Sequence, residues 1–487
     1  MTSNKLLKLV LSGSLLCMGT LVGASTDNCD WPIMNHDTHN TRNNPCETQI
    51  NTSNVANLVV DWQFNSATWV QGAPAVVNGV VYFADFGGNL YAKNVASGTD
   101  VFPPVNLGAA CEGGILVTED TIYTSTSDLR LHARNLDLTP KAAFNGGSVV
   151  VDPGAVGRAQ ILACPVIAEN IIIIPIANNL AEVTTNINTT LRGGFQAFDA
   201  TTGTFLWRTP VIKLNEGTAG GSISTAAIDH DLHLMFAGTS NATSPPAGKT
   251  TCALVAIDYR TGEIKWDHRQ TKNGVWGALY PCGNDFDLGA SPNLFTIHHK
   301  GKSYKVVGCC NKAGIYRVYI RKTGQLVWES RLFPKSEVPS INGNPGAAYN
   351  DGIIYTSSNV DRSGRPFNVI SVLAQNSNLQ AGLALFDGLM NTDFNYLHAV
   401  RAHDGKVLWT RITQSSTFPS MTHANGVLYT GNFRGEFRAL DAANSNVLRN
   451  EATGLGVIGA PITVVDGRVF VGFGLGAAGG LRVYSLP

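Results

Sequence analysis

The chain has 487 residues, of which only 14% are charged, and it contains 51 glycines. Its 35 basic residues equal its 35 acidic ones, so no excess charge favours nucleic acid or an acidic membrane surface as a partner. Low charge, abundant glycine and many Val, Ile, Thr and Tyr segments are typical of an all-β protein with numerous tight turns.

The first 24 residues are predicted to be a removable export signal. Lys5 and Lys8 precede a mostly apolar stretch, Leu9–Val22, and Gly23-Ala24 offers a small-residue cleavage site. An uncleaved anchor would need about 18–20 apolar residues, and this stretch is shorter and interrupted by small polar residues. We therefore expect export to the periplasm, or secretion from the cell, and a mature chain 25–487 that forms one domain without a transmembrane segment.

Eight cysteines in the mature chain fit an oxidising compartment. We predict the bridge Cys29–Cys46, because both residues flank the segment that leads into the rest of the chain. The adjacent pair Cys309–Cys310 leaves two alternatives, a strained vicinal bridge or two buried thiols with separate partners. No Cys-x-x-Cys-His motif occurs, so no covalently bound haem is expected.

After an apolar strand at Leu58–Phe64, the chain repeats one unit eight times. Each unit is expected to form the strands of one small sheet, and the units span 72–102, 113–140, 163–207, 224–266, 291–328, 345–409, 418–450 and 459–487. Four units contain an Asn-Gly or Asp-Gly pair, as at Asn78-Gly79, which suits a two-residue hairpin turn because both residues tolerate positive φ.

A second turn ends in Gly with Trp four residues later, as at Gly262 and Trp266. This Trp is expected to pack between neighbouring sheets. A single four-stranded sheet cannot bury both faces, but radial stacking does so. The last unit lacks its outermost strand, and Leu58–Phe64 is a spare strand at the other end. The pattern therefore predicts an eight-bladed β-propeller that is closed by the N-terminal strand.

Several segments carry a resemblance to a known family: Asp30-Trp31-Pro32, Asn40-Thr41-Arg42, Thr48–Val55 and Gly454–Ile462, together with the tryptophan-turn repeats. The chain resembles the pyrroloquinoline quinone (PQQ) dehydrogenases, the quinoprotein alcohol dehydrogenases, and within them the polyvinyl alcohol dehydrogenase branch. The resemblance implies PQQ and Ca²⁺ as cofactors, and a small-molecule or polymeric alcohol as the substrate. It also implies a separate electron acceptor such as a c-type cytochrome.

The resemblance assigns four site residues, each of which has an alternative reading as an ordinary turn or loop residue. Asn241 and Glu182 match the family's calcium ligands, since amide and carboxylate oxygens suit a hard cation. Asp285 matches the catalytic base, with Asp287 as a neighbouring candidate. Lys312 matches the cation that contacts the quinone oxygens and stabilises charge developing on them.

The chain also departs from the family at the cofactor. It has Gln71 where the large alcohol dehydrogenases have a Glu, and only Cys111 where they have a vicinal cysteine pair. The Trp beneath the quinone is replaced within Ser222–Ser224. A flat quinone would lose both stacking partners, so the alternative function is a non-catalytic propeller that acts as a periplasmic scaffold or binding module.

Overall fold

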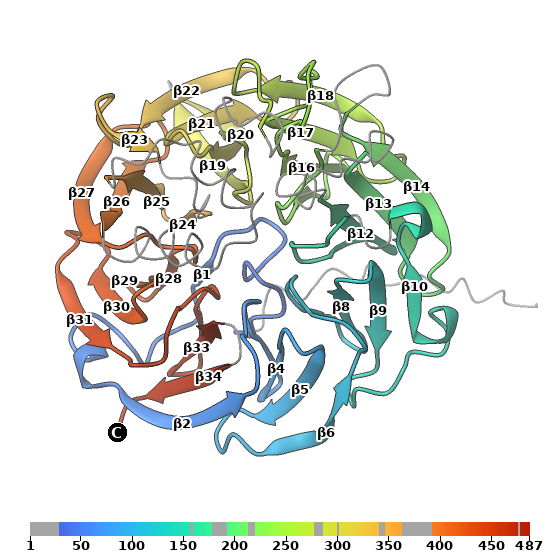
Figure 1. The fold of residues 1–487 in the computed structure, drawn as a ribbon. Helices are drawn as coiled ribbons and strands as arrows, with labels where there is room; N and C mark the ends of the chain where they lie inside the picture. The colour runs from blue at the N-terminus through green and yellow to red at the C-terminus, as the bar shows by residue number, and fades with distance from the viewer. Residues whose placement is uncertain are drawn as a thin grey trace, which may run out of the picture.

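In the computed structural model, eight small sheets stand as blades around a central channel (Figure 1). The structure describes residues 29–155, 159–177, 192–212, 220–276, 286–299, 301–339, 346–362, 392–475 and 478–487. Among them the helices are single 3₁₀ turns, at η1 (Val55–Asn57), η2 (Asn145–Gly147) and η3 (Pro153–Ala155). The prediction of an eight-bladed β-propeller is confirmed.

The four main strands of each blade are antiparallel, and in the first seven blades they follow one another from the inner strand at the channel to the outer strand at the rim. The short β1 (Asn43–Asn44) is added to the seventh blade in parallel with β28 (Thr422–Ala424). The strands of the first four blades are β3 (Ala75–Val77), β4 (Val80–Ala84), β5 (Asn89–Asn94) and β6 (Asp100–Asn106); β7 (Leu116–Val117), β8 (Ile122–Thr126), β9 (Arg130–Arg134) and β10 (Ser148–Val150); β11 (Val166–Ala168), β12 (Ile171–Ile176), β13 (Gly194–Asp199) and β14 (Phe205–Pro210); β15 (Ala227–Asp229), β16 (Leu234–Gly238), β17 (Ala253–Asp258) and β18 (Ile264–Arg269).

The other four blades follow the same plan, with one added strand in the sixth and one in the seventh. Their strands are β19 (Asn293–His299), β20 (Lys302–Cys310), β21 (Ile315–Ile320) and β22 (Leu326–Arg331); β23 (Val338–Pro339), β24 (Ala348–Asn350), β25 (Ile353–Asp361), β26 (Phe394–Arg401) and β27 (Val407–Gln414); β1 (Asn43–Asn44), β28 (Thr422–Ala424), β29 (Val427–Gly431), β30 (Glu436–Asp441) and β31 (Val447–Ala452); β32 (Thr463–Val465), β33 (Arg468–Leu475), β34 (Ala478–Ser485) and β2 (Val59–Ser66).

The N-terminal strand closes the ring. β2 pairs antiparallel with β34 and becomes the outer strand of the last blade, with Val60 opposite Tyr484 and Phe64 opposite Leu481. Figure 1 shows this blue strand beside the red C-terminal strands. The predicted role of Leu58–Phe64 is therefore confirmed, and the last blade gains the outer strand that its own repeat lacks.

Tryptophans of the outer strands join neighbouring blades at five of the eight junctions. The indole nitrogens of Trp62, Trp207, Trp266, Trp328 and Trp409 donate to backbone carbonyls of the following blade at 2.9–3.0 Å. The turn glycine of that blade lies against the indole: a Cβ on Gly262 would lie 2.7 Å from the Trp207 ring. Gly and Trp therefore recur together because one packs on the other across the blade boundary.

The second blade departs from the predicted repeat. Its fourth strand, β10, lies beyond the expected end at residue 140, because this repeat carries no Gly-x-x-x-Trp turn. Phe144 and Val149 take the place of the indole. A Cβ on Gly203 of the third blade would lie 3.3 Å from the Phe144 ring and 2.9 Å from a methyl group of Val149. The blade junction is kept with different side chains.

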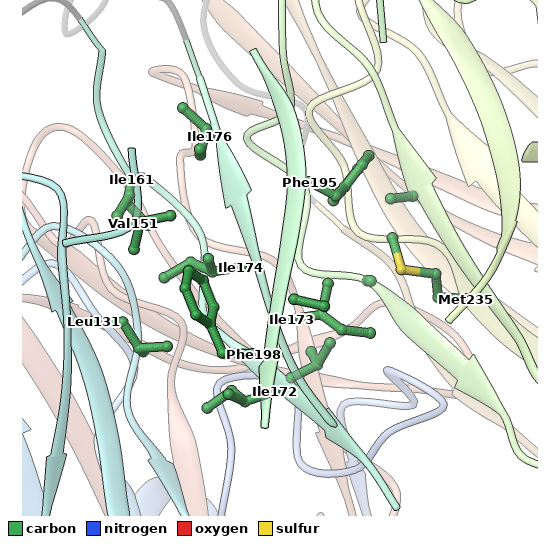
Figure 2. Packing of buried hydrophobic residues seen from close by; sticks show 14 of the residues in the cluster. Leu131, Val151, Ile161, Ile172, Ile173, Ile174, Ile176, Phe195, Phe198 and Met235 are labelled. Carbon is green, nitrogen blue, oxygen red and sulfur yellow. The ribbon is translucent and has the colours of Figure 1, made fainter. Parts of the chain in front are cut away.

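The middle strands of the blades are buried on both faces, whereas the outer strands alternate. In Figure 2, Ile172 and Ile174 of β12 face Leu131 and Val151 of the second blade, and Ile173 points to the opposite side. Burying one such side chain contributes about 1.5–3 kcal/mol. Apolar packing between sheets thus holds the ring together.

The same alternation places the adjacent cysteines of β20 on opposite faces of the sheet. Cys309 packs in the cluster between the fourth and fifth blades, and Cys310 packs in the cluster between the fifth and sixth. Both are free thiols. Of the two alternatives for this pair, the structure has the separately buried thiols, because neighbouring residues of a strand point to opposite faces.

Residues 30–44, here called the N-terminal arm, run inside the ring and are hydrogen-bonded to the blades in turn (Figure 1). The backbone bonds are Trp31 N to Val76 O (2.7 Å), Val117 N to Pro32 O (2.8 Å), Ile228 N to Thr38 O (2.7 Å), Leu294 N to His39 O (2.9 Å), Tyr349 N to Thr41 O (2.8 Å) and His423 N to Arg42 O (2.9 Å). Asn44 Nδ2 donates to Val464 O of the last blade at 2.8 Å.

Candidate functional site

A cavity of about 250 Å³ lies in the channel where the inner strands begin. Each blade contributes residues from just before its inner strand, and the N-terminal arm and the β20–β21 turn contribute the rest. The lining residues are Gln71, Gly72, Glu112, Leu162, Ile223, Thr225, Gly289, Ser291, Gly346, Phe418, Ser420, Gly459, Pro461, Met34, Arg42 and Lys312. Their convergence follows from the ring, since equivalent positions of all blades meet at the axis.

Two arm residues, Met34 and Arg42, line this cavity, whereas His39 and Thr41 line a second cavity of about 560 Å³ beside Arg321. The arm therefore separates the two cavities along the channel. We take the first cavity as the candidate site, because Gln71 and Lys312, which the sequence singled out, line it and do not line the second.

Lys312 and Asp287 form a buried ion pair at the candidate site. The ammonium nitrogen lies 3.0 Å from the Asp287 carboxylate, and the side chains are 10% and 3% exposed. The Lys312 backbone N–H also donates to the Asp287 carbonyl at 3.2 Å. This second bond ties the β20–β21 turn to the segment before β19, so the charged pair is held by backbone as well as side chains.

Gln71 and Cys111 were both predicted at the cofactor, and the structure places them differently. Gln71 lines the cavity together with Lys312. Cys111 packs in the apolar cluster between the first two blades, where burial raises the pKa of its thiol to about 12. Its neighbour Glu112 lines the cavity instead, and burial raises the pKa of that carboxyl.

Asn241 is fully buried in the connection after β16. Of the described residues that line the cavity, none is Asn241. Its Oδ1 accepts a hydrogen bond from the Cys252 thiol at 2.9 Å. The other predicted calcium ligand, Glu182, and the predicted base, Asp285, lie outside the described residues.

The described residues meet the needs of PQQ and of calcium to different degrees. A planar quinone with carboxylates suits the cavity, which combines two cations, Arg42 and Lys312, with apolar walls from Leu162, Ile223 and Phe418. Calcium needs about six to eight oxygens. Within the described ranges no group of three or more His, Cys, Asp or Glu side chains could hold a metal.

The sequence reasoning missed Arg42 and Glu112 as cavity residues. Arg42 carries only part of the family resemblance, in Asn40-Thr41-Arg42, and no motif singles out Glu112. The available signal for Glu112 was a charged residue between Cys111 and Gly113, whereas Arg42 lies among the polar residues Asn40, Thr41 and Asn43 and has no such signal.

No helix in the described part of the chain is both long and apolar enough to cross a bilayer.

Comparison with known protein families gives two matches. Residues 31–346 match the family described as glucose/ethanol/alcohol dehydrogenase, β-propeller domain, under the name PQQ. Residues 312–486 match the family of the outer membrane protein assembly factor BamB.

Among curated proteins, the chain is 25% identical to a polyvinylalcohol dehydrogenase of a Pseudomonas species, over 89% of this chain and 69% of that protein. It is 24% identical to the quinohemoprotein alcohol dehydrogenase of Comamonas testosteroni, over 94% of this chain and 73% of that protein.

Solved structures show the same fold at lower identity. The crystal structure of the Comamonas testosteroni quinohemoprotein alcohol dehydrogenase has a TM-score of 0.73 at 19% identity, and it covers 94% of this chain and 80% of its own. A europium-containing methanol dehydrogenase has a TM-score of 0.73 at 16% identity, with 94% and 99% covered. BamB from Moraxella catarrhalis has a TM-score of 0.56 at 14% identity, with 88% and 99% covered.

Proposed function

Because the chain belongs to the PQQ family of glucose/ethanol/alcohol dehydrogenase β-propellers, we propose that it is an exported, PQQ-dependent dehydrogenase that oxidises an alcohol. The substrate is a small-molecule or polymeric alcohol, and the electrons leave to a separate carrier such as a c-type cytochrome. The dehydrogenase names of the relatives support the reaction class, and the polyvinylalcohol dehydrogenase supports a polymeric substrate.

The observation that carries this proposal is the buried Lys312–Asp287 pair at a cavity built from all eight blades. A fixed cation in a water-poor cavity stabilises an oxygen on which negative charge develops. Asp287 holds the ammonium group 3.0 Å away, so Lys312 is positioned before any ligand arrives.

PQQ, when bound, supplies the carbonyl that accepts hydride from the alcohol carbon. The chain's own residues do the remaining work. Lys312 would stabilise the negative charge that develops on the quinone oxygens, and the apolar walls exclude water. Asp285, or Asp287 as the neighbouring candidate, accepts the hydroxyl proton as the general base. Asn241 and Glu182 are the proposed calcium ligands.

The proposed cellular location is the periplasm, or the medium if the protein is secreted. Residues 1–24 are removed as a signal peptide, and 25–487 act there as one propeller domain. The basic start and the apolar stretch of the leader support this.

A second candidate function is a non-catalytic scaffold or binding module. The match of residues 312–486 to the BamB family favours it, as does the replacement of the family's stacking Trp within Ser222–Ser224, where Ile223 now lines the cavity.

The deciding experiment adds PQQ and Ca²⁺ to the purified protein. The dehydrogenase proposal expects a bound chromophore after dialysis and dye-linked oxidation of an alcohol, tested with ethanol and with polyvinyl alcohol. If the protein neither binds PQQ nor oxidises an alcohol, the dehydrogenase proposal is rejected and the scaffold function is favoured.

The role of Asp285 is tested with Asp285→Asn, which keeps the shape of the side chain and removes the base. Turnover is expected to be abolished, while PQQ binding, followed by absorbance, stays nearly unchanged. Loss of PQQ binding would instead make Asp285 a ligand or a structural group.

A further inference from the structure

Arg42 is a buried cation at the candidate site. Its side chain belongs to the N-terminal arm and lines the cavity, although the residue is only 1% exposed. Nη1 donates to the Ala347 carbonyl at 2.9 Å, and the buried Nε has no hydrogen-bond partner among the described residues. A guanidinium group carries five donors, so this one has capacity left for a ligand.

Within the described ranges no carboxylate forms an ion pair with Arg42, and Asp37, whose charge raises the pKa of Arg42, is hydrogen-bonded to His36 and Thr41 instead. Asp287 is paired with Lys312, and the Glu112 carboxylate accepts a hydrogen bond from Gln160 Nε2 at 3.5 Å. Burial lowers the pKa of Arg42 only to about 10, so the guanidinium is charged at neutral pH. A buried charge without an ionic partner is unfavourable, and an anion bound beside it removes that cost.

The chain is built so that the guanidinium reaches this position. A Cβ on Gly346 would lie 2.3 Å from both Nη1 and Nη2 of Arg42, so only glycine leaves the space. The backbone of Arg42 is anchored on both sides, since its N–H donates to Asn35 O at 3.1 Å and its carbonyl accepts from His423 N at 2.9 Å.

We propose that Arg42 binds a carboxylate of the ligand that occupies this cavity, and that this ligand is a planar, polycarboxylated molecule. Guanidinium and carboxylate match in geometry, because two parallel N–H donors face two oxygens. The apolar walls, with Ile223 and Phe418, suit a flat ring system. The identification of that ligand as PQQ rests on the proposed function, whereas the carboxylate contact itself does not.

The test measures binding rather than activity. Wild type, Arg42→Gln and Arg42→Lys are titrated with PQQ and with benzene-1,3,5-tricarboxylate by equilibrium dialysis. Arg42→Gln is expected to bind both at least tenfold more weakly, and Arg42→Lys is expected to lie between it and wild type. Arg321→Gln is the matched control, because Arg321 is also buried but already paired with Asp229 at 3.0 Å. Its affinity for both ligands should equal that of wild type.

If Arg42→Gln does not fold, Gly346→Ala carries the test, because it keeps Arg42 and displaces the guanidinium. Wild type should bind the tricarboxylate at least tenfold more tightly than its neutral trimethyl ester, and Gly346→Ala should lose this preference. Equal binding by wild type and a folded Arg42→Gln overturns the inference, as does an unchanged preference in Gly346→Ala.

The same titrations separate this inference from the proposed function. Tricarboxylate binding that depends on Arg42, without any PQQ binding, would reject the dehydrogenase and leave the carboxylate site. PQQ binding that does not change when Arg42 is replaced would reject the carboxylate site at Arg42 and keep the dehydrogenase proposal.

Discussion

At the scale of single residues, the buried Lys312–Asp287 pair makes the candidate site sensitive to the loss of either partner. Replacing Asp287 by Asn takes the ionic partner from a cation that is 10% exposed. Because removing one member of a buried pair leaves its charge in a poorly solvated place, we expect the free energy of unfolding to fall by about 2–4 kcal/mol. Denaturant unfolding followed by tryptophan fluorescence measures this.

The control is an exposed pair between the same two residue types. Lys305 and Asp231 are 52% and 75% exposed. Asp231→Asn should change the free energy of unfolding by less than about 1 kcal/mol, because water screens the pair. Equal losses in the two variants would contradict the view that burial makes the Asp287 pair important.

At the scale of elements, the junction between blades is set by a glycine against an indole. Gly262 has φ +77° and lies against Trp207, whereas Gly79 has φ +74° and no described atom within 4 Å of the point where a Cβ would stand. Gly79→Ala should therefore cost about 1–2 kcal/mol, from the left-handed backbone alone. Gly262→Ala should cost about 1–3 kcal/mol more, because the methyl group overpacks the junction.

Thermal unfolding midpoints of the two alanine variants test this difference. Since the backbone strain is matched, the gap between the two midpoints reports the contacts of the new methyl group with the Trp207 ring and with Thr209 Oγ1, each 2.7 Å from the Cβ position. Similar midpoints would mean that the indole moves aside and that the blade junction is looser than its geometry indicates.

Three buried histidines on blade strands predict acid sensitivity. Burial lowers the pKa of His132 and His423 to about 4 and that of His398 to about 3. The unfolded chain binds these protons near pH 6.5, so it takes up more protons than the folded chain as the pH falls from there. Stability should fall by up to about 1.4 kcal/mol per pH unit for each histidine between pH 6.5 and about 4.

Unfolding midpoints at pH 7, 6 and 5 measure this slope. A triple His→Asn variant should show a flatter dependence over the same range. An equally steep slope in that variant would assign the acid sensitivity to other groups.

At the scale of the whole molecule, the arm and β2 join the start of the chain to its end. Cys29 and Cys46 flank the arm and, contrary to the predicted bridge, are both free thiols in the structure. Hydrogen bonding between the two thiols, together with burial, raises the pKa of Cys29 to about 11. We expect these neighbouring thiols to be oxidised to a disulfide after export. Closing the loop between residues 29 and 46 would stabilise the fold by about 3 kcal/mol on the chain-entropy model.

Free-thiol counting on unfolded, unreduced protein, followed by peptide mapping, tests the bridge. The Cys29→Ser/Cys46→Ser variant should show a lower unfolding midpoint only under non-reducing conditions. Eight free thiols in the wild-type protein would contradict the prediction.

The repeat itself determined the fold. The fold can be recognised from short motifs, because each motif forms a turn or a contact with the adjacent blade. Examples are Asn78-Gly79 and Gly262 followed by Trp266. The spare strand at Leu58–Phe64 then has one place left to pair. The predicted range of the second blade is too short, because Phe144 replaces the tryptophan there and β10 lies beyond residue 140.

The composition of the cavity was decided by the tertiary structure. Its residues come from the irregular connections before the inner strands, where no period fixes which side chain faces the axis. Glu112 therefore faces the cavity while Cys111 turns into the core. Arg42 reaches the same cavity because the arm crosses the channel, a placement set by hydrogen bonds to strands such as β28, far away in the sequence. Long-range contacts of this kind have no local sequence signal.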